Sequence, residues 1–172
     1  MTHTYDIFET PLGWMGALAS PGGVRRTTLP QSTPDECVAL LGPEMASAAH
    51  IPGDLTHLRR ALDAYFAGEV VTFTDVALDL DSAPPFLSAA WAVCRSIPYG
   101  ETRSYKWLAA QAGSPLALRA AGQSMARNRI PIVIPCHRVL ASNGALHGFG
   151  KDASQLDLKA KLLEIERRGR RA

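Results

Sequence analysis

Three short segments near the start of the chain, each with apolar positions, are bounded by turn residues, as short strands are. Pro11-Leu12-Gly13 and Pro21-Gly22-Gly23 separate these segments and supply turn residues, which predicts a small β-meander. The predicted strands cover residues 4–9, 14–19 and 24–29.

The rest of the first 80 residues predicts one helix and one further strand. Residues 55–67 carry apolar side chains at helical spacing, and Gly68 marks the end of that helix. Residues 70–80 alternate and predict another strand, whereas residues 30–53, rich in Pro, Ser and Gly, predict an irregular connection. This part of the chain indicates a small α/β domain without recognisable chemistry of its own.

Helical patterns dominate beyond a proline-containing linker at residues 81–85. Ser142-Asn143-Gly144 predicts a turn ahead of the last helix. The predicted helices cover residues 86–97, 104–111, 114–126 and 155–168. We therefore expect an α+β fold, in which a small N-terminal α/β domain of residues 1–80 precedes a mainly helical C-terminal domain of residues 86–172.

Two of these helices are close enough in sequence to form a helix-turn-helix unit. Ser104 is a suitable N-cap for the first helix, and Gly113 follows its end. Ser114-Pro115 predicts an N-cap followed by proline at the first position of the second helix. Such a pair can bind DNA, but helix pairs of this size are also common in helical cores.

The net charge of +2 conceals an asymmetry between the two halves of the chain. Residues 1–85 contain 4 Lys/Arg and 11 Asp/Glu, a balance of −7, whereas residues 86–172 contain 14 and 5, a balance of +9. Without the four arginines of residues 167–171, the second half still has a balance of +5. A basic half favours contact with a polyanion, and two ordinary solvated faces are the alternative.

The composition, 47% hydrophobic and 20% charged, is that of a soluble globular protein. No basic start followed by an apolar stretch and no apolar run of membrane-spanning length is present, so we expect neither a signal peptide nor membrane contact. Three widely spaced cysteines argue against a disulfide framework and favour a cytoplasmic location. We expect no catalytic metal, because no C-x-x-C or H-E-x-x-H motif occurs.

The run Ile134-Pro135-Cys136-His137-Arg138-Val139 carries the strongest chemical signal in the chain. A thiol next to an imidazole and a guanidinium predicts a cysteine of low pKa, and the thiolate is the nucleophilic form. The alternative is a small buried cysteine that happens to adjoin a histidine.

Several motifs surround that run in a fixed order. They are Ile97-Pro98-Tyr99-Gly100-Glu101-Thr102-Arg103-Ser104-Tyr105, Leu118-Arg119-Ala120-Ala121-Gly122, Asn128, and Leu162-Leu163 with Glu166. Together they resemble the O6-alkylguanine-DNA alkyltransferases, single-turnover proteins that repair alkylated guanine. The resemblance covers about residues 86–166 and extends to the first 80 residues only in size and coarse layout. It implies a monomer that acts on double-stranded DNA containing O6-alkylguanine, without a cofactor.

The resemblance implies a role for each matched residue of the reactive centre. Cys136 would take the alkyl group in one displacement. His137 would remove the thiol proton through a water molecule, and Glu166 would orient and stabilise the imidazole. Asn128 would stiffen the active-site turn, while Arg138 would brace the domain. Without the resemblance, Glu166 would be interpreted as a solvated helix acid.

The same resemblance implies how DNA is held and how the base is reached. The lesion must rotate out of the duplex, with Arg119 filling the vacated space and Tyr105 crowding the target phosphate. The helix pair would lie in the minor groove, which suits binding without sequence preference. Further DNA contacts are expected at Ser104, Ala120 and Gly122. The residues expected around the alkyl group are Trp91, Pro131, Val139, Phe149 and Gly150.

The chain departs from the family's pattern in places, and other functions are therefore considered. Phe149 stands where relatives usually carry tyrosine, and residues 148–155 are longer and more charged than the usual Gly-rich run. One alternative is a protein that recognises alkylguanine without repairing it. A thiol hydrolase and a helix-turn-helix regulator are others, but the first lacks an oxyanion-hole signal and the second leaves the cysteine run unexplained. Cys37, His50 and His57 are weak candidates for a structural zinc site, which some relatives contain.

Overall fold

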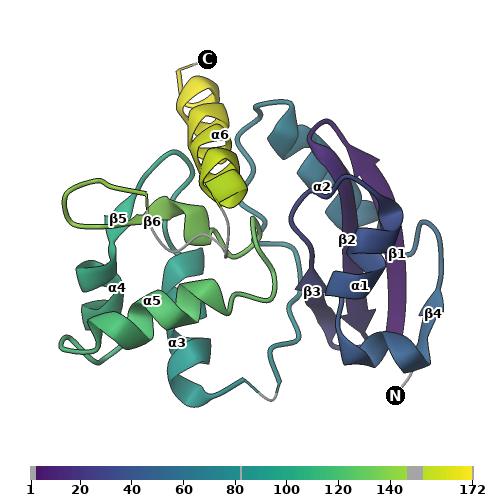
Figure 1. Cartoon of the computed structure of the whole chain (residues 1–172), viewed down its shortest axis with the longest axis horizontal. Coiled ribbons are helices and arrows are strands. Elements are labelled where there is room, and N and C mark those ends of the chain that lie inside the picture. The colour runs from purple at the N-terminus through teal and green to yellow at the C-terminus, as the bar shows by residue number, and fades with distance from the viewer. Residues whose placement is uncertain (1–2, 82, 147–152, 172) are drawn as a thin grey trace. The chain divides into compact units, whose positions relative to one another are not determined.

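The residues that the computed structural model describes are 3–81, 83–146 and 153–171. The chain divides into two compact units (Figure 1). The first contains Met1–Asp81 together with Arg129–Pro131, and the second contains Ser82–Asn128 and Ile132–Ala172. The first unit is a sheet with helices and the second is mainly helical, so the predicted α+β fold class is confirmed.

A four-stranded sheet forms the centre of the first unit. Its order is β3-β2-β1-β4, with antiparallel pairs among the first three strands and a parallel pair between β1 and β4. The strands are β1 (His3–Thr10), β2 (Gly13–Ser20), β3 (Gly23–Thr27) and β4 (Ala48–His50). The predicted meander is therefore confirmed, and β4 is an addition at its edge.

Two helices cover opposite faces of this sheet. Ile7 points to the face of α1 (Pro34–Leu40), since a side chain on its partner Gly16 would meet Ile7 together with Cys37 of α1. Phe8 points to the other face, where Arg59 of α2 (Thr56–Phe66) lies 5.8 Å from its ring centroid. Successive strand residues face opposite sides, so each layer of the core takes every second residue.

Two expectations for the first unit are wrong. Residues 30–53 are not simply irregular, because a capping box between Thr33 and Glu36 starts α1 and a 3₁₀ turn, η1 (Pro43–Ser47), precedes β4. Residues 70–80 form no regular strand and make one isolated bridge to Val24. The positive φ of Phe73, 54°, interrupts the extended backbone. The apolar positions that suggested a strand include Phe73 and Val76, whose side chains are buried in the core.

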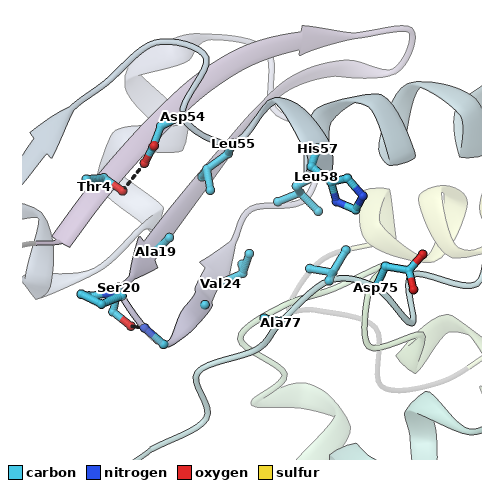
Figure 2. A pocket seen from close by; sticks show the side chains of 14 residues that line it. Thr4, Ala19, Ser20, Val24, Asp54, Leu55, His57, Leu58, Asp75 and Ala77 are labelled. Atoms are coloured by element: carbon cyan, nitrogen blue, oxygen red, sulfur yellow. Dashed lines mark hydrogen bonds between the residues drawn. The ribbon is translucent and has the colours of Figure 1, made fainter.

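A shallow pocket of about 300 Å³ lies between the sheet and the start of α2 in the first unit (Figure 2). Asp54, His57 and Asp75 are among its polar lining residues. Asp54 already accepts a hydrogen bond of 2.7 Å from the Thr4 hydroxyl, drawn as a dashed line in Figure 2. The pocket is lined by residues of the first unit, whereas Cys136 belongs to the second, so the pocket does not include the candidate nucleophile.

In the residues that the structure describes, the second unit consists of four α-helices and a short two-stranded sheet. Its helices are α3 (Pro85–Arg95), α4 (Tyr105–Gln111), α5 (Leu118–Ala126) and α6 (Ala153–Gly169). The strands β5 (Arg103–Ser104) and β6 (Val139–Leu140) pair in parallel, and the 3₁₀ turn η2 (Cys136–Arg138) leads into β6. α3 packs against both α4 and α5, and the indole nitrogen of the buried Trp91 donates to the Ser124 carbonyl at 2.8 Å.

The helix-turn-helix pair is present, with one change at its second helix. Ser104 caps α4 as predicted by accepting a bond of 3.0 Å from the Trp107 amide, and Gly113 follows that helix with φ of 84°. α5 does not begin at Ser114-Pro115 as expected. The Ala117 amide bonds to the Ser114 carbonyl, closing a separate turn, and Ala117 itself is the N-cap.

Candidate active site

Cys136 begins the turn η2 at the end of a buried apolar run. The side chains of Ile130, Ile132 and Ile134 are buried, and the thiol residue is 5% exposed. Ile132 has φ of 73°, which is strained for a β-branched residue and turns the chain sharply four residues before Cys136. The Cys136 amide then donates to the Ile134 carbonyl at 2.8 Å and fixes the turn.

Asn128 ties this turn to the end of α5. Its side-chain amide donates to the Ile134 carbonyl at 2.7 Å, and its backbone amide donates to Met125 at 3.2 Å. The side chain also hydrogen bonds to Cys136, which favours the thiolate. Asn128 therefore connects the turn to the end of α5 and contacts the sulfur as well.

His137 and Glu166 form a fully buried pair next to the thiol in sequence. The His137 Nε2 atom lies 2.6 Å from the Glu166 Oε1 atom. Burial lowers the pKa of His137, and the hydrogen bond and charge of Glu166 oppose that effect without overcoming it. A neutral imidazole that donates from Nε2 to the carboxylate presents Nδ1 as a proton acceptor.

Arg138 holds the same carboxylate from the other side. Its Nε atom lies 3.1 and 3.0 Å from the two Glu166 oxygens, and its Nη1 atom donates to the Ile97 carbonyl at 2.6 Å. The Gly100 amide adds a bond of 3.0 Å to Glu166. Burial raises the pKa of Glu166, but His137 and Arg138 outweigh it and lower the value to about 2. Arg138 thus braces the domain, as expected, rather than facing the sulfur.

The expectation of a low-pKa cysteine is wrong for the free protein. Burial raises the pKa of the Cys136 thiol, and this effect exceeds the lowering by the Asn128 hydrogen bond and by the positive charge of Lys159. The guanidinium expected to help is instead directed at Glu166. The resting sulfur is therefore a protonated thiol, and a base must take its proton before it can react.

Lys159 on α6 is a site residue that the sequence pattern did not single out. Its side chain is fully buried, its Nζ atom donates to the Val139 carbonyl at 2.8 Å, and that atom lies 6.0 Å from the Tyr105 ring centroid. Burial lowers the pKa of Lys159 to about 8, while Cys136 raises it. The available signal was the spacing of Lys159 and Glu166, which puts both on the apolar stripe of α6.

The structure brings Tyr105 close to this centre. Tyr105 is the first residue of α4 and is half-buried. Burial, with a further contribution from the charge of Cys136, raises the pKa of Tyr105 to about 12, so its phenol stays protonated. A protonated phenol near the sulfur can donate a hydrogen bond to a nucleobase held there.

The other expected DNA contacts lie on or beside the helix pair. Arg119 is exposed on α5, while Ala120 and Gly122 of the same helix are half-buried. No atom lies within 4 Å of the position a Gly122 side chain would take, so the fold itself does not require glycine there. Ser104 is occupied as the cap of α4.

The expected pocket residues are more scattered. Val139 is buried and follows η2 directly, whereas Trp91 is a core residue between α3 and α5. Pro131 clusters with the first unit, where its carbonyl accepts a bond of 3.4 Å from the Thr27 hydroxyl. Phe149 and Gly150 lie outside the described residues.

No metal centre forms among the described residues, where no three His, Cys, Asp or Glu side chains gather suitably. The Cys37 thiol instead donates to the Trp14 carbonyl at 3.2 Å, and the His50 ring stacks on Tyr5. Within the same described ranges, no helix has both the length and the apolarity to span a bilayer.

Comparisons of the sequence with known proteins point to methyltransferases that act on methylated DNA. The model of the "6-O-methylguanine DNA methyltransferase, DNA binding domain" matches residues 85–168. The constitutive methylated-DNA–protein-cysteine methyltransferase of Bacillus subtilis is 46% identical over 95% of this chain and 94% of its own length. The chain belongs to this methyltransferase family. Its relative from Methanosarcina barkeri is 37% identical over 94% of this chain and 96% of its own length.

Solved structures of the family share the fold. The crystal structure of Mycobacterium tuberculosis OGT in complex with DNA superimposes with a TM-score of 0.79 at 34% identity, covering 98% of this chain and 94% of that one. That of the M. tuberculosis O6-methylguanine methyltransferase gives 0.78 at 32% identity, covering 96% and 93%. The methyltransferase and DNA-binding predictions are thus confirmed at the level of the family.

Proposed function

We infer that this protein repairs double-stranded DNA by moving the alkyl group of O6-alkylguanine onto its own Cys136 in a single turnover. The observation that carries the inference is the buried Cys136 thiol followed directly by a histidine that a buried carboxylate orients. This is the nucleophile, base and orienting acid that activation of a weak nucleophile requires.

The proposed reaction begins with loss of the thiol proton. Neutral His137 takes it at Nδ1 through one water molecule, and the anionic Glu166 stabilises the resulting imidazolium. The Cys136 thiolate, favoured by Asn128 and Lys159, attacks the alkyl carbon. The sulfur–carbon bond forms as the carbon–O6 bond breaks. The departing guanine takes up a proton from solvent and the imidazolium returns the thiol proton to solvent, so that overall the alkyl group and the thiol proton change places. A thioether has no ready leaving path, so each molecule repairs one lesion.

The DNA side of the site is supported by charge and by small residues. Between Glu101 and Asp152 the sequence contains seven Lys/Arg and no Asp/Glu, and this stretch includes both helices of the pair. A basic stretch of sequence without acids suits contact with the phosphate backbone. Gly122, with open space in place of a side chain, allows a DNA backbone to approach α5 closely.

We further propose that the protein works as a monomer in the cytoplasm. Cys136, His137, Asn128 and Glu166 all come from the second unit of one chain, so no partner subunit is needed to complete the centre. All three cysteines are free thiols, which suits a reducing compartment.

Intact-protein mass spectrometry tests the proposed function most directly. After incubation with a duplex that contains one O6-methylguanine, we expect the protein to gain the mass of one CH₂ group, and peptide mapping to place it on Cys136. Unmodified duplex is the control. Binding to the lesion without any mass gain would instead identify a recognition protein that does not repair.

Replacing the exposed Arg119 with alanine tests base rotation. We expect repair in duplex DNA to slow about a hundredfold, because the vacated base position loses its filler and unstacking a base costs a few kcal/mol. Reaction with free O6-benzylguanine should be nearly unaffected. The matched control is Arg127→Ala, which removes an exposed charge at the other end of α5. Equal losses on duplex and free base would remove this role from Arg119.

A further inference from the structure

Two leucines close to Arg119 in the sequence are exposed and take no part in the buried core. Leu116 is 98% exposed and Leu118 is 50% exposed. A single exposed leucine is common on protein surfaces and carries little information. This pair differs because both members lie within three positions of Arg119, at the entrance to α5.

The local backbone explains why Leu116 protrudes. If α5 had begun at Pro115, Leu116 would have been part of its first turn. The structure instead closes residues 114–117 into a separate turn through the bond between the Ala117 amide and the Ser114 carbonyl, 2.9 Å long. Leu116 occupies an inner position of this turn and is the most exposed large apolar residue among those that the structure describes.

The surroundings of this apolar tip identify a partner. The tip lies within the acid-free stretch between Glu101 and Asp152, where Arg119 is the exposed charge next to it in sequence and Lys106 is exposed on α4 of the same helix pair. Basic groups around an apolar tip match duplex DNA, which presents phosphates at the rim of a groove and stacked bases at its floor. A hydrophobic protein partner would not require the surrounding acids to be absent.

We propose that Leu116 and Leu118 form an apolar wedge that enters the minor groove beside Arg119 and weakens the stacking of the lesion. This rests on the proposed function and adds a second element to base rotation. Arg119 fills the space after the base has left, whereas the wedge acts on the stack before it leaves. Burial of a leucine against unstacked bases also returns part of the unstacking energy.

The test compares Leu116→Ala and the double variant with Leu118→Ala in the full-length protein. We measure the repair rate for O6-methylguanine in a duplex, the rate for free O6-benzylguanine, and the affinity for the lesion duplex. The double variant should repair the duplex about tenfold more slowly, which corresponds to losing most of one leucine's burial, with the free-base rate unchanged. Leu116→Met, which keeps the apolar volume, should repair the duplex at the rate of the unchanged protein.

Leu40→Ala is the matched control, because Leu40 is 54% exposed on α1 of the first unit. The proposal is overturned if the double variant binds and repairs the duplex like the unchanged protein, or if free-base and duplex rates fall together. Placing the lesion opposite an abasic site should shrink the loss, since less stacking then has to be broken. If the unchanged protein transfers no methyl group, the proposed function fails. The wedge is then tested by affinity alone: the double variant should bind the lesion duplex more weakly than the unchanged protein, and equal affinity would overturn the wedge.

Discussion

Replacing Cys136 with alanine will abolish alkyl transfer while leaving the affinity for lesion-containing duplex within about threefold. The sulfur is the atom that forms the new bond to the alkyl carbon, so its loss removes the acceptor of the alkyl group. DNA binding should persist because the expected contacts are made by residues of α4 and α5 and not by the sulfur itself. Methyl transfer measured by mass spectrometry and binding measured by fluorescence anisotropy report the two properties separately.

Cys94 provides the matched control for this experiment. It is also fully buried in the second unit, but burial raises its pKa well above the usual range and the charge of Cys136 raises it further. Cys94→Ala should therefore keep full stoichiometric transfer and lose only about 1 kcal/mol of stability from the small cavity. Transfer by the Cys136 variant, or its loss in the Cys94 variant, would contradict the assignment of the nucleophile.

Local patterns in the sequence were sufficient for most of the fold. The meander followed from its turn residues and α2 from helical spacing, and α4 followed from the Ser104 cap and Gly113. The strand expected at residues 70–80 failed because alternation records which side chains are buried, and an irregular segment can bury every second or third residue too. The start of α5 was misplaced because Ser114-Pro115 also looks like an N-cap followed by the first helical residue. In the structure residues 114–117 form a separate turn, and α5 begins after Ala117.

The candidate centre was predictable in its members but not in its electrostatics. The resemblance indicated Cys136, His137 and Glu166, and the structure brings the last two within 2.6 Å of each other. The pKa of the Cys136 thiol is raised because the thiol is buried. The sequence does not show this burial, and the neighbouring Arg138 suggested the opposite shift. Lys159 went unnoticed for the same reason, since a lysine on a helix is normally a solvated residue. The strained φ of Ile132 has no sequence signature at all.

Replacing Glu166 with glutamine should damage both stability and reactivity. The change removes the buried negative charge and leaves Arg138 uncompensated, which we expect to cost about 3 kcal/mol of unfolding free energy. It also removes the negative charge that stabilises the protonated form of His137, and it leaves one acceptor oxygen where His137 and Arg138 now share two. Transfer to Cys136 should then slow at least about a hundredfold, as measured by single-turnover kinetics under conditions where the variant is folded.

The pH dependence of stability provides an independent measure of the same group. Because the folded pKa of Glu166 is lowered from 4.5 to about 2, its contribution is complete above about pH 4.5 and is lost as the pH falls towards 2. Denaturant unfolding of the unchanged protein should therefore show stability decreasing across that range. In Glu166→Gln the decrease should be smaller by about 3 kcal/mol.

Glu164→Gln separates this effect from ordinary surface electrostatics. Glu164 lies two residues earlier on α6, and its bonds to Arg167 and Arg168 also lower its pKa to about 2, but it is exposed to solvent. Exposed pairs of this kind contribute little to stability because water and salt screen them. We expect the Glu164 variant to keep the stability, the acid profile and the transfer rate of the unchanged protein. If Glu164→Gln and Glu166→Gln behaved alike, the contacts of Glu166 with His137 and Arg138 would not be what orients the His137 imidazole.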